Sequence, residues 1–282
     1  MQTYFVVLSI AGSDSCGGAG IQADIKTISA LGGYAATAIT SLTAQNTLGV
    51  KQIHSVNADF LEAQIEAVMS DLPVVAVKIG MVNTAKNVEI IAKMLHKYKP
   101  KHIVVDPVMI STSGSQLSDN ECIKAMEEQL FPLAEVLTPN LHEAEALAGF
   151  PIKTKEDILN AIATISKRYN PFALLLKGGH LESDHKVDWL KIRESELLLS
   201  FPHKTIETNN LHGTGCSLSS AIATFLTYPD MDVPQATATA IEYVQNAINA
   251  GKDIFAGHGN GAINHFFDPK KMKINQLSQN FQ

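Results

Sequence analysis

Cysteine is scarce in this sequence. Three cysteines, Cys16, Cys122 and Cys216, occur among 282 residues. They are too few and too far apart to form a disulfide framework. No C-x-x-C pair is present, so the usual signature of a structural zinc site is also missing. We therefore expect a protein of the reducing cytoplasm.

Long hydrophobic runs are absent as well. The longest, such as Tyr4–Ile10 and Ala173–Leu176, are far shorter than the roughly 20 apolar residues that a membrane-spanning helix needs. The first three residues carry no Lys or Arg, and Asp14 follows soon after the first apolar run. We therefore expect no signal peptide and no membrane partner.

Positive charge is in deficit. Lys and Arg number 22 against 28 Asp and Glu, which leaves a net charge of −6, and no basic block stands out. A nucleic-acid partner is thus disfavoured, because binding to a phosphate backbone needs clustered Lys and Arg. No linker or low-complexity stretch divides the chain, so we expect one domain over residues 1–269. The polar residues 270–282 are expected to form a frayed tail.

The sequence alternates between apolar strand-like runs and helical spacing. The runs that predict strands are Tyr4–Ala11, Ala35–Leu42, Val74–Ile79, His102–Val105, Val136–Leu137 and Phe172–Leu176. Helices are predicted from Ile21 to Leu31 and at Ala58–Met69, Thr84–Tyr98, Lys155–Tyr169 and Ser217–Leu226. This alternation indicates an α/β fold whose mostly parallel sheet is covered by helices on both faces. The more charged segments Lys186–Arg193 and Glu196–Phe201 predict a β-hairpin near a sheet edge.

Polar side chains follow directly after several of the predicted strands. They include Gly12-Ser13-Asp14, Gln45, Met81, Asp106, Asn140 and Lys177. In a parallel sheet, the loops after the carboxyl ends of the strands form the ligand crevice. We therefore expect these residues to gather along one edge of the sheet, although they are scattered in sequence.

Three glycines lie in the run Asp14–Gly20, between the first strand and the first helix. Such glycines let the backbone approach a ligand, and the free N–H groups of a helix start bind anions. The run also satisfies a loose dinucleotide-binding pattern. That reading needs an acid for the ribose, and none occurs between Asp24 and Asp59, so a hydride-transfer enzyme is disfavoured. A structural tight turn explains the glycines equally well.

A second glycine motif, His212-Gly213-Thr214-Gly215-Cys216, precedes a predicted helix. Its backbone N–H groups would converge on one point with the helix dipole behind them, forming an anion hole. In the first turn of the helix, Cys216 is predicted to have a depressed pKa. A packed apolar cysteine after a turn is the plainer alternative. No Walker A sequence is present, which excludes a P-loop enzyme.

Acidic and basic candidates complete the pattern. Asn140 followed by Glu143 is typical of an ordinary capped helix start. Together with Asp106, however, Glu143 could hold a hydrated Mg²⁺ beside phosphates. Lys177 at a strand end could neutralise a phosphate. A late glycine-rich loop over residues 257–261 is expected to be flexible, and either closes over a site or merely connects two elements.

Taken together, these motifs resemble the hydroxymethylpyrimidine/phosphomethylpyrimidine kinases of thiamine biosynthesis, within the ribokinase-like group. The resemblance extends from Ile10 to about Phe267. Its landmarks are Ala11-Gly12-Ser13-Asp14-Ser15-Cys16-Gly17-Gly18-Ala19-Gly20-Ile21-Gln22-Ala23-Asp24, Ala44-Gln45-Asn46-Thr47, Lys78-Ile79-Gly80-Met81, Asp106-Pro107-Val108-Met109, Thr138-Pro139-Asn140, Lys177-Gly178-Gly179-His180 and His212-Gly213-Thr214-Gly215-Cys216. So many landmarks in one order make the match far more specific than any single glycine pattern.

The resemblance implies a ribokinase-like three-layer sandwich and two ATP-dependent steps. The first phosphorylates the hydroxymethyl group of 4-amino-5-hydroxymethyl-2-methylpyrimidine, and the second converts the monophosphate into the diphosphate. Gly12, Asp24, Gln45, Met81 and Val108 would line the pyrimidine pocket. Physically, the Gln45 amide offers a donor and an acceptor to an aminopyrimidine edge, and Met81 a polarizable face to its ring.

The resemblance also assigns the transfer chemistry. Cys216 would act as the catalytic base, where ribokinase relatives use Asp, and the amides of Gly213, Thr214, Gly215 and Cys216 would bind the charge of the transferring group. Asp106 and Glu143 are expected to hold Mg²⁺ through waters, with Asn140 and Lys177 near the triphosphate. Relatives are commonly homodimers, so we expect one here.

Two residues depart from the family pattern. Thr112 stands where many relatives carry Lys, and Ala262 stands where Pro is usual. Two other functions remain open beside the pyrimidine kinase, and the departures support only the second of them. Related folds phosphorylate vitamin B6, although Gln45 is less suited than an apolar residue to a pyridine ring. The second alternative is a ligand-binding sensor that kept the pocket but lost phosphate transfer. The intact Gly213–Cys216 segment argues against it.

Overall fold

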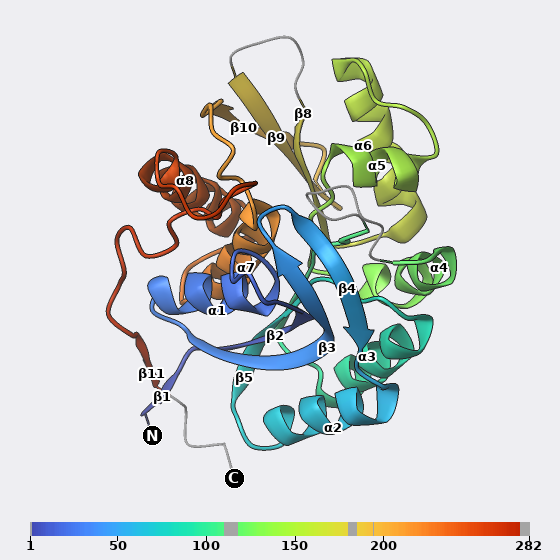
Figure 1. Ribbon diagram of the computed structural model, residues 1–282. Coiled ribbons are helices and arrows are strands. Elements are labelled where there is room, and N and C mark those ends of the chain that lie inside the picture. Colours follow the sequence, from blue (N-terminus) through green and yellow to red (C-terminus); the bar gives the residue numbers. More distant parts are fainter. Residues whose placement is uncertain (1, 110–117, 180–184, 194, 277–282) are drawn as a thin grey trace.

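A nine-stranded sheet forms the centre of the computed structural model, which describes residues 2–109, 118–179, 185–193 and 195–276 (Figure 1). The strand order is β10-β9-β8-β7-β6-β5-β2-β3-β4. The strands are β2 (Val6–Asp14), β3 (Tyr34–Asn46), β4 (Gly49–Ser55), β5 (Val74–Ile79), β6 (His102–Val105), β7 (Val136–Leu137), β8 (Ala173–Gly179), β9 (His185–Ile192) and β10 (Leu198–Lys204). Neighbours from β8 through β3 are parallel, and β4, β9 and β10 pair antiparallel at the two edges.

Helices cover both faces of this sheet. They are α1 (Gly20–Ala30), α2 (Ala58–Met69), α3 (Ala85–Tyr98), α4 (Asn120–Gln129), α5 (Leu141–Ala148), α6 (Lys155–Tyr169), α7 (Thr214–Leu226) and α8 (Val233–Gly251), with a 3-10 turn η1 (Phe131–Leu133). Helices α1, α7 and α8 lie on one face, and α2 to α6 lie on the other (Figure 1). This arrangement confirms the predicted α/β class and its three layers.

Two hydrophobic cores lie on opposite sides of the sheet. Successive residues of β2 contribute to them alternately: Leu8 and Ile10 pack under α2 to α6, whereas Val7 packs under α1, α7 and α8. All three side chains are fully buried. A strand that is covered on both faces has no polar alternation, which explains why this part of the fold was readable from apolar runs alone.

The predicted edge hairpin is confirmed, with β9 and β10 paired antiparallel. The expectation of a frayed tail is wrong in part, because β11 (Ile274–Gln276) pairs antiparallel with β1 (Gln2–Tyr4). The backbone N–H groups of Lys270 and Lys273 also donate to Ala30 and Gly32. Backbone pairing needs no apolar side chains, so a polar composition did not reveal it.

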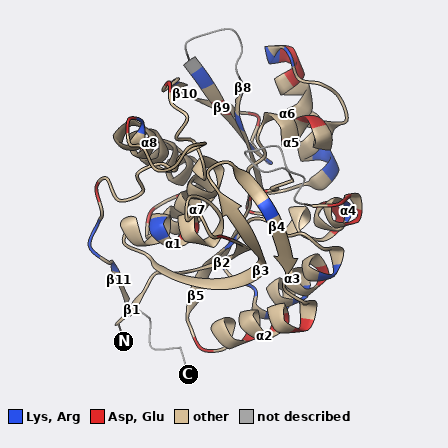
Figure 2. Ribbon diagram, in the orientation of Figure 1, with Lys and Arg blue, Asp and Glu red and all other residues tan. Residues whose placement is uncertain are grey.

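Charged residues lie mostly on the outer helices. Figure 2 shows Lys and Arg interspersed with Asp and Glu there, without an extended region of one sign in this view. In the part of the chain that the structure describes, no helix combines the length and the apolar character needed to cross a bilayer.

The core of α2 provides a stability test. Leu61 is fully buried, and Leu197 is 71% exposed. We expect Leu61→Ala to lower the free energy of unfolding by about 2–5 kcal/mol, because it removes buried contacts and leaves a cavity. Leu197→Ala should change it by less than about 0.5 kcal/mol. Urea unfolding of both variants measures the difference, and equal values for the two would contradict this packing.

Candidate active site

A cavity of about 650 Å³ opens at the carboxyl edge of the parallel strands. The predicted site residues that line it are Gly12, Gln45, Met81, Asp106, Val108, Asn140, Glu143, Lys177, Gly213, Thr214, Gly215 and Cys216. They come from the ends of β2, β3, β5, β6, β7 and β8 and from the starts of α5 and α7. The predicted gathering of these residues along one sheet edge is therefore confirmed, and Asp24 is the exception.

The start of α7 exposes backbone donors to this cavity. Gly213 is the N-cap with φ 86°, and no side chain caps the helix. A Cβ at Gly213 would lie 1.8 Å from the carbonyl oxygen of Gly18, so only glycine fits here. Among the described residues, the N–H groups of Gly215 and Cys216 meet no acceptor. Free donors at a helix N-terminus attract an anion.

Cys216 lies in this first turn, with its sulfur near the N–H of Gly20. Burial raises the pKa of the Cys216 thiol to about 11, although Lys78 and the Gly20 N–H act in the opposite direction. The prediction of a depressed pKa is therefore wrong. Desolvation of a thiolate outweighs the helix dipole here, and the carboxylates of Asp24 and Asp106 add to the rise.

Asp24 lies below the cavity and does not line it, so its predicted place in the pyrimidine pocket is wrong. Its carboxylate pairs with Lys78 at 2.8 Å, and both side chains are completely buried. It also accepts hydrogen bonds from Ser9 Oγ at 2.5 Å and Ser220 Oγ at 2.7 Å. Ser220 lies one turn after Cys216 on α7. Asp24 thereby joins β2, β5 and α7 beneath the thiol.

This buried pair makes a second stability prediction. Replacing Lys78 by Met leaves the Asp24 carboxylate buried without its cation, which should lower the free energy of unfolding by about 3–5 kcal/mol. The control is Lys93→Met, which breaks the exposed pair with Glu62 and should cost less than about 1 kcal/mol. Chemical denaturation measures both variants, and similar losses for the two would disprove the contrast.

Asp106 and Lys177 form an ion pair at 2.8 Å beside the glycine turn. A Cβ at Gly215 would lie only 3.3 Å from Lys177 Nζ. Burial alone would raise the pKa of Asp106, but Lys177, Lys78 and a hydrogen bond from Thr138 hold it below its usual range. Asp106 is therefore a carboxylate next to the free amides of α7.

Glu143 is buried nearby at the start of α5. Asn140 caps this helix, and its own N–H donates to Glu143 Oε2 at 2.7 Å. The plainer interpretation of this pair, an ordinary capping box, is thus confirmed. Burial raises the pKa of Glu143 to about 7, Lys177 opposes the rise, and Asp106 adds to it. Asp106 and Glu143 repel one another, and a cation bound beside both would reduce this repulsion.

The raised pKa of Glu143 predicts a pH-dependent stability. Its pKa is about 7 in the folded protein against an ordinary value of 4.5. The stability gained from the protonated form is complete below pH 4.5 and is lost as the pH rises through 7. The free energy of unfolding of the wild type, relative to Glu143→Gln, should fall by about 3 kcal/mol over this range. Denaturant titrations at several pH values test this, and a flat difference would refute it.

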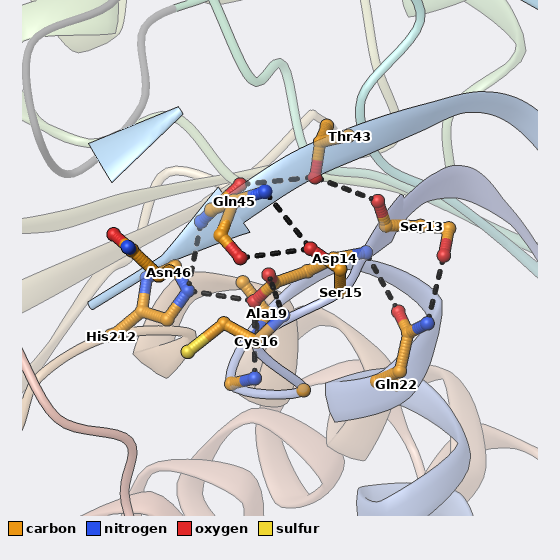
Figure 3. A network of polar contacts seen from close by, with 12 residues as sticks. Ser13, Asp14, Ser15, Cys16, Ala19, Gln22, Thr43, Gln45, Asn46 and His212 are labelled. Carbon is orange, nitrogen blue, oxygen red and sulfur yellow. Dashed lines mark hydrogen bonds and ion pairs between the residues drawn. The ribbon is translucent and has the colours of Figure 1, made fainter. Parts of the chain in front are cut away.

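A network at the other side of the cavity was not predicted from the sequence. His212 Nε2 lies 2.8 Å from Asp14 Oδ2 and 3.1 Å from the Gln45 side-chain amide. Figure 3 shows the three side chains meeting between the glycine-rich turn, the end of β3 and the segment before α7. His212 belongs to the glycine motif from which the anion hole was predicted, but its ring points to the glycine-rich turn that carries Asp14.

The far end of the cavity has an apolar wall that the sequence analysis also missed. Ile241, Val244 and Ile248 line it from α8, and Lys186 and His203 of the edge hairpin line it as well. Their i, i+3, i+7 spacing is typical of one helix face, and it was a signal that could have found them.

The two family departures have different outcomes. Thr112 lies outside the described residues. Ala262 forms an isolated bridge with His212. The preceding loop was expected to be flexible, yet the N–H groups of Gly259 and Asn260 donate to Thr47, and His212 N–H donates to Gly261. The loop therefore connects the β3–β4 turn to the cavity.

Comparison with known proteins identifies the relatives of this chain. The family model described as phosphomethylpyrimidine kinase matches residues 14–264. The chain belongs to this family. The hydroxymethylpyrimidine/phosphomethylpyrimidine kinase of Rhizobium meliloti is 45% identical over 93% of this chain and 97% of its own length. The Escherichia coli enzyme of the same name is 38% identical over 92% and 96%.

Solved structures confirm the ribokinase-like kinase fold. The phosphomethylpyrimidine kinase of Clostridium difficile superimposes with a TM-score of 0.75 at 40% identity, covering 86% of this chain and 99% of that one. The pyridoxal kinase of Staphylococcus aureus in complex with AMP-PCP and pyridoxal has a TM-score of 0.84 at 26% identity, covering 98% and 100%. The family resemblance inferred from the sequence motifs is thus confirmed.

Proposed function

We propose that this chain phosphorylates the hydroxymethyl group of 4-amino-5-hydroxymethyl-2-methylpyrimidine with ATP, and then phosphorylates the monophosphate to the diphosphate, as a phosphotransferase of thiamine biosynthesis. The observation that carries the proposal is one cavity in which Gln45 and Met81 lie together with the free amides of α7 and Cys216. Relatives that are 45% and 38% identical bear the corresponding name.

The pyrimidine binds at the end formed by Gly12, Gln45, Met81 and Val108. A Cβ at Gly12 would lie 2.9 Å from Ser41 Oγ and 3.0 Å from Met81 Sδ, so only glycine leaves the methionine in this place. The thioether then packs against the aromatic ring, and the Gln45 amide pairs with the polar edge. This places the hydroxymethyl group toward Cys216.

Transfer forms a bond between the hydroxymethyl oxygen and the γ-phosphorus and breaks the bond to the β-phosphate oxygen, so ADP leaves. The hydroxyl proton passes to the Cys216 thiolate. The backbone N–H groups of Gly215 and Cys216, with Gly213 and Thr214 shaping the turn, stabilise the charge that spreads over the transferring group. The raised pKa of Cys216 keeps the sulfur protonated until a substrate or a higher pH favours the thiolate.

The triphosphate lies between this turn and Lys177, whose ammonium group neutralises phosphate charge, with Asn140 beside it. The Asp106 and Glu143 carboxylates fit Mg²⁺, because they are adjacent, buried and mutually repelling. Because Mg²⁺ usually keeps several of its waters, these two carboxylates would hold it largely through waters. When bound, the ion would neutralise phosphate oxygens.

The base assignment predicts a steep dependence on Cys216 and on pH. Cys216→Ala should lower kcat by about 10²–10⁴-fold with little change in pyrimidine affinity, because the side chain acts on the proton and not on the ring. In the wild type, log(kcat/KM) should rise by about one for each pH unit from 7 to 10, because the thiolate fraction does so. Steady-state assays of ADP release measure both.

Two variants control this experiment. Cys122→Ala removes a buried thiol that bonds to the Val82 carbonyl, away from the cavity, and should keep the wild-type kcat. Cys216→Asp supplies a base that ionises at lower pH and should turn over with a flatter pH profile. If Cys216→Ala retains more than a tenth of the wild-type turnover, the thiol is not the base.

Pyridoxal phosphorylation is the second candidate, favoured by the similarity to the pyridoxal kinases of Staphylococcus aureus and Bacillus subtilis. Comparing kcat/KM for the pyrimidine and for pyridoxal decides between the two. A ligand-binding sensor without transfer would show no ADP release with either. The expected homodimer and the expected cytoplasmic location stay predictions, the first of which light scattering in solution would check.

A further inference from the structure

The geometry points to Asp14 and His212 as positioning residues: they hold the Gln45 side-chain amide with its oxygen toward His212, so that its free lone pair and free N–H match the amino group and ring nitrogen of a 4-aminopyrimidine. This inference rests on the proposed function and deepens it, since it names the part of the molecule that selects the pyrimidine.

Asp14 is the fixed negative end of this network. Its carboxylate accepts hydrogen bonds from the backbone N–H groups of Cys16 at 2.8 Å, Gly18 at 3.0 Å and Ala19 at 2.9 Å. Burial alone would raise its pKa, but His212 and these N–H groups hold the pKa of Asp14 below its ordinary value. A carboxylate in this state can only accept hydrogen bonds.

The state of Asp14 then determines that His212 carries a proton on Nε2. Its Nε2 lies 2.8 Å from Asp14 Oδ2, and two acceptors at that distance would repel one another. Nε2 therefore carries a proton. The same nitrogen lies 3.1 Å from the Gln45 amide atom assigned as the side-chain nitrogen Nε2, which would find no acceptor on a ring nitrogen that already carries a proton. Because a donor already occupies Nε2, the amide atom that suits this place is the oxygen and not the nitrogen.

Thr43 independently favours the same orientation. Its hydroxyl has one proton, and Thr43 Oγ1 donates it to the Ser13 carbonyl at 2.9 Å. The other end of the Gln45 amide, assigned as the oxygen Oε1, lies 3.3 Å from the same Oγ1. With its proton used, Oγ1 can only accept there, so the amide nitrogen belongs on this side. Both neighbours of Gln45 thus require one orientation of the amide.

Gln45 lines the cavity, so we assign its two remaining hydrogen-bonding groups to a ligand bound there. His212 uses one lone pair of the oxygen, and Thr43 uses one N–H. The second lone pair can accept from an exocyclic amino group, and the second N–H can donate to the adjacent ring nitrogen. Reversing the amide would put a donor opposite the amino group. A pyridine substrate without that amino group leaves the oxygen lone pair unpaired.

The surroundings keep these groups in place. A Cβ at Gly18 would lie 2.4 Å from His212 Cδ2, so the imidazole packs directly on glycine backbone. The Gln45 main chain is held by Ser15, whose Oγ donates to its carbonyl at 2.8 Å and accepts from its N–H at 2.9 Å. These contacts hold the His212 imidazole and the Gln45 main chain in place.

The experiment compares kcat/KM for the aminopyrimidine with that for the same pyrimidine lacking the 4-amino group. The ratio of the two values measures recognition of the amine. In His212→Phe, which has no donor, the ratio should fall about tenfold or more, chiefly through KM for the amine. In His212→Gln, whose amide N–H can replace Nε2–H, it should stay within about threefold of the wild type.

The control is His102→Phe, which breaks another His–carboxylate pair, the partly buried one with Glu135 at 2.7 Å, at the amino edge of the parallel strands. It should leave the ratio unchanged even if it lowers the melting temperature. A purely structural role for His212 would lower kcat/KM for both substrates alike. Should His212→Phe fail to fold, His212→Asn, polar but too short to reach, gives the same measurement.

The outcomes separate the two proposals. If the wild type does not phosphorylate the aminopyrimidine, the proposed function fails. If it does, yet the ratio is the same in the wild type, in His212→Phe and in His212→Asn, the function stands and the positioning role is refuted. A ratio that collapses in His212→Phe and returns in His212→Gln establishes it.

Discussion

The buried ion pair between Asp24 and Lys78 is the constraint on which the cavity depends. Neither side chain reaches water, so each charge is stable only because the other is there. Asp24 comes from α1 and Lys78 from β5, and Ser9 of β2 and Ser220 of α7 bind the same carboxylate. Four elements thereby meet at one group, directly below the start of α7. The position of the glycine turn relative to the sheet follows from this junction.

Above that junction, the polar residues of the cavity form two groups with different roles. Asp106, Glu143 and Lys177 gather where phosphates are expected. Lys177 and Lys78 hold the pKa of Asp106 down against burial, whereas burial, with a smaller contribution from Asp106, raises the pKa of Glu143. Asp14, His212 and Gln45 lie at the pyrimidine end, where hydrogen-bond direction matters more than net charge. Cys216 lies between the two sets, and burial sets the protonation of its thiol.

Much of this was accessible from the sequence, because strands covered on both faces are apolar throughout and the residues after them share one edge. Asp24 was misplaced because a motif gives order along the chain but not depth: the residue faces inward from α1, toward Lys78. The pKa of Cys216 was misjudged because helix position was visible in the sequence and burial was not. His212 and Asp14 were missed as a pair because they are 198 residues apart. The wall from α8 had a readable apolar spacing, and a Pro in its first turn with a capping box at Asp232.

The pairing of β1 with β11 brings the first and last described strands together, with Gln2 opposite Gln276. This ribbon lies beside Gly32, where the chain enters β3, and hence at the amino edge of the parallel strands, away from the cavity (Figure 1). A second catalytic module joined to the chain beyond β1 or β11 would attach at this amino edge and leave the entrance of the cavity open. Because Gln2 and Gln276 lie side by side, a short peptide could link these two described strands and new termini could be opened in a surface loop, with the central sheet intact.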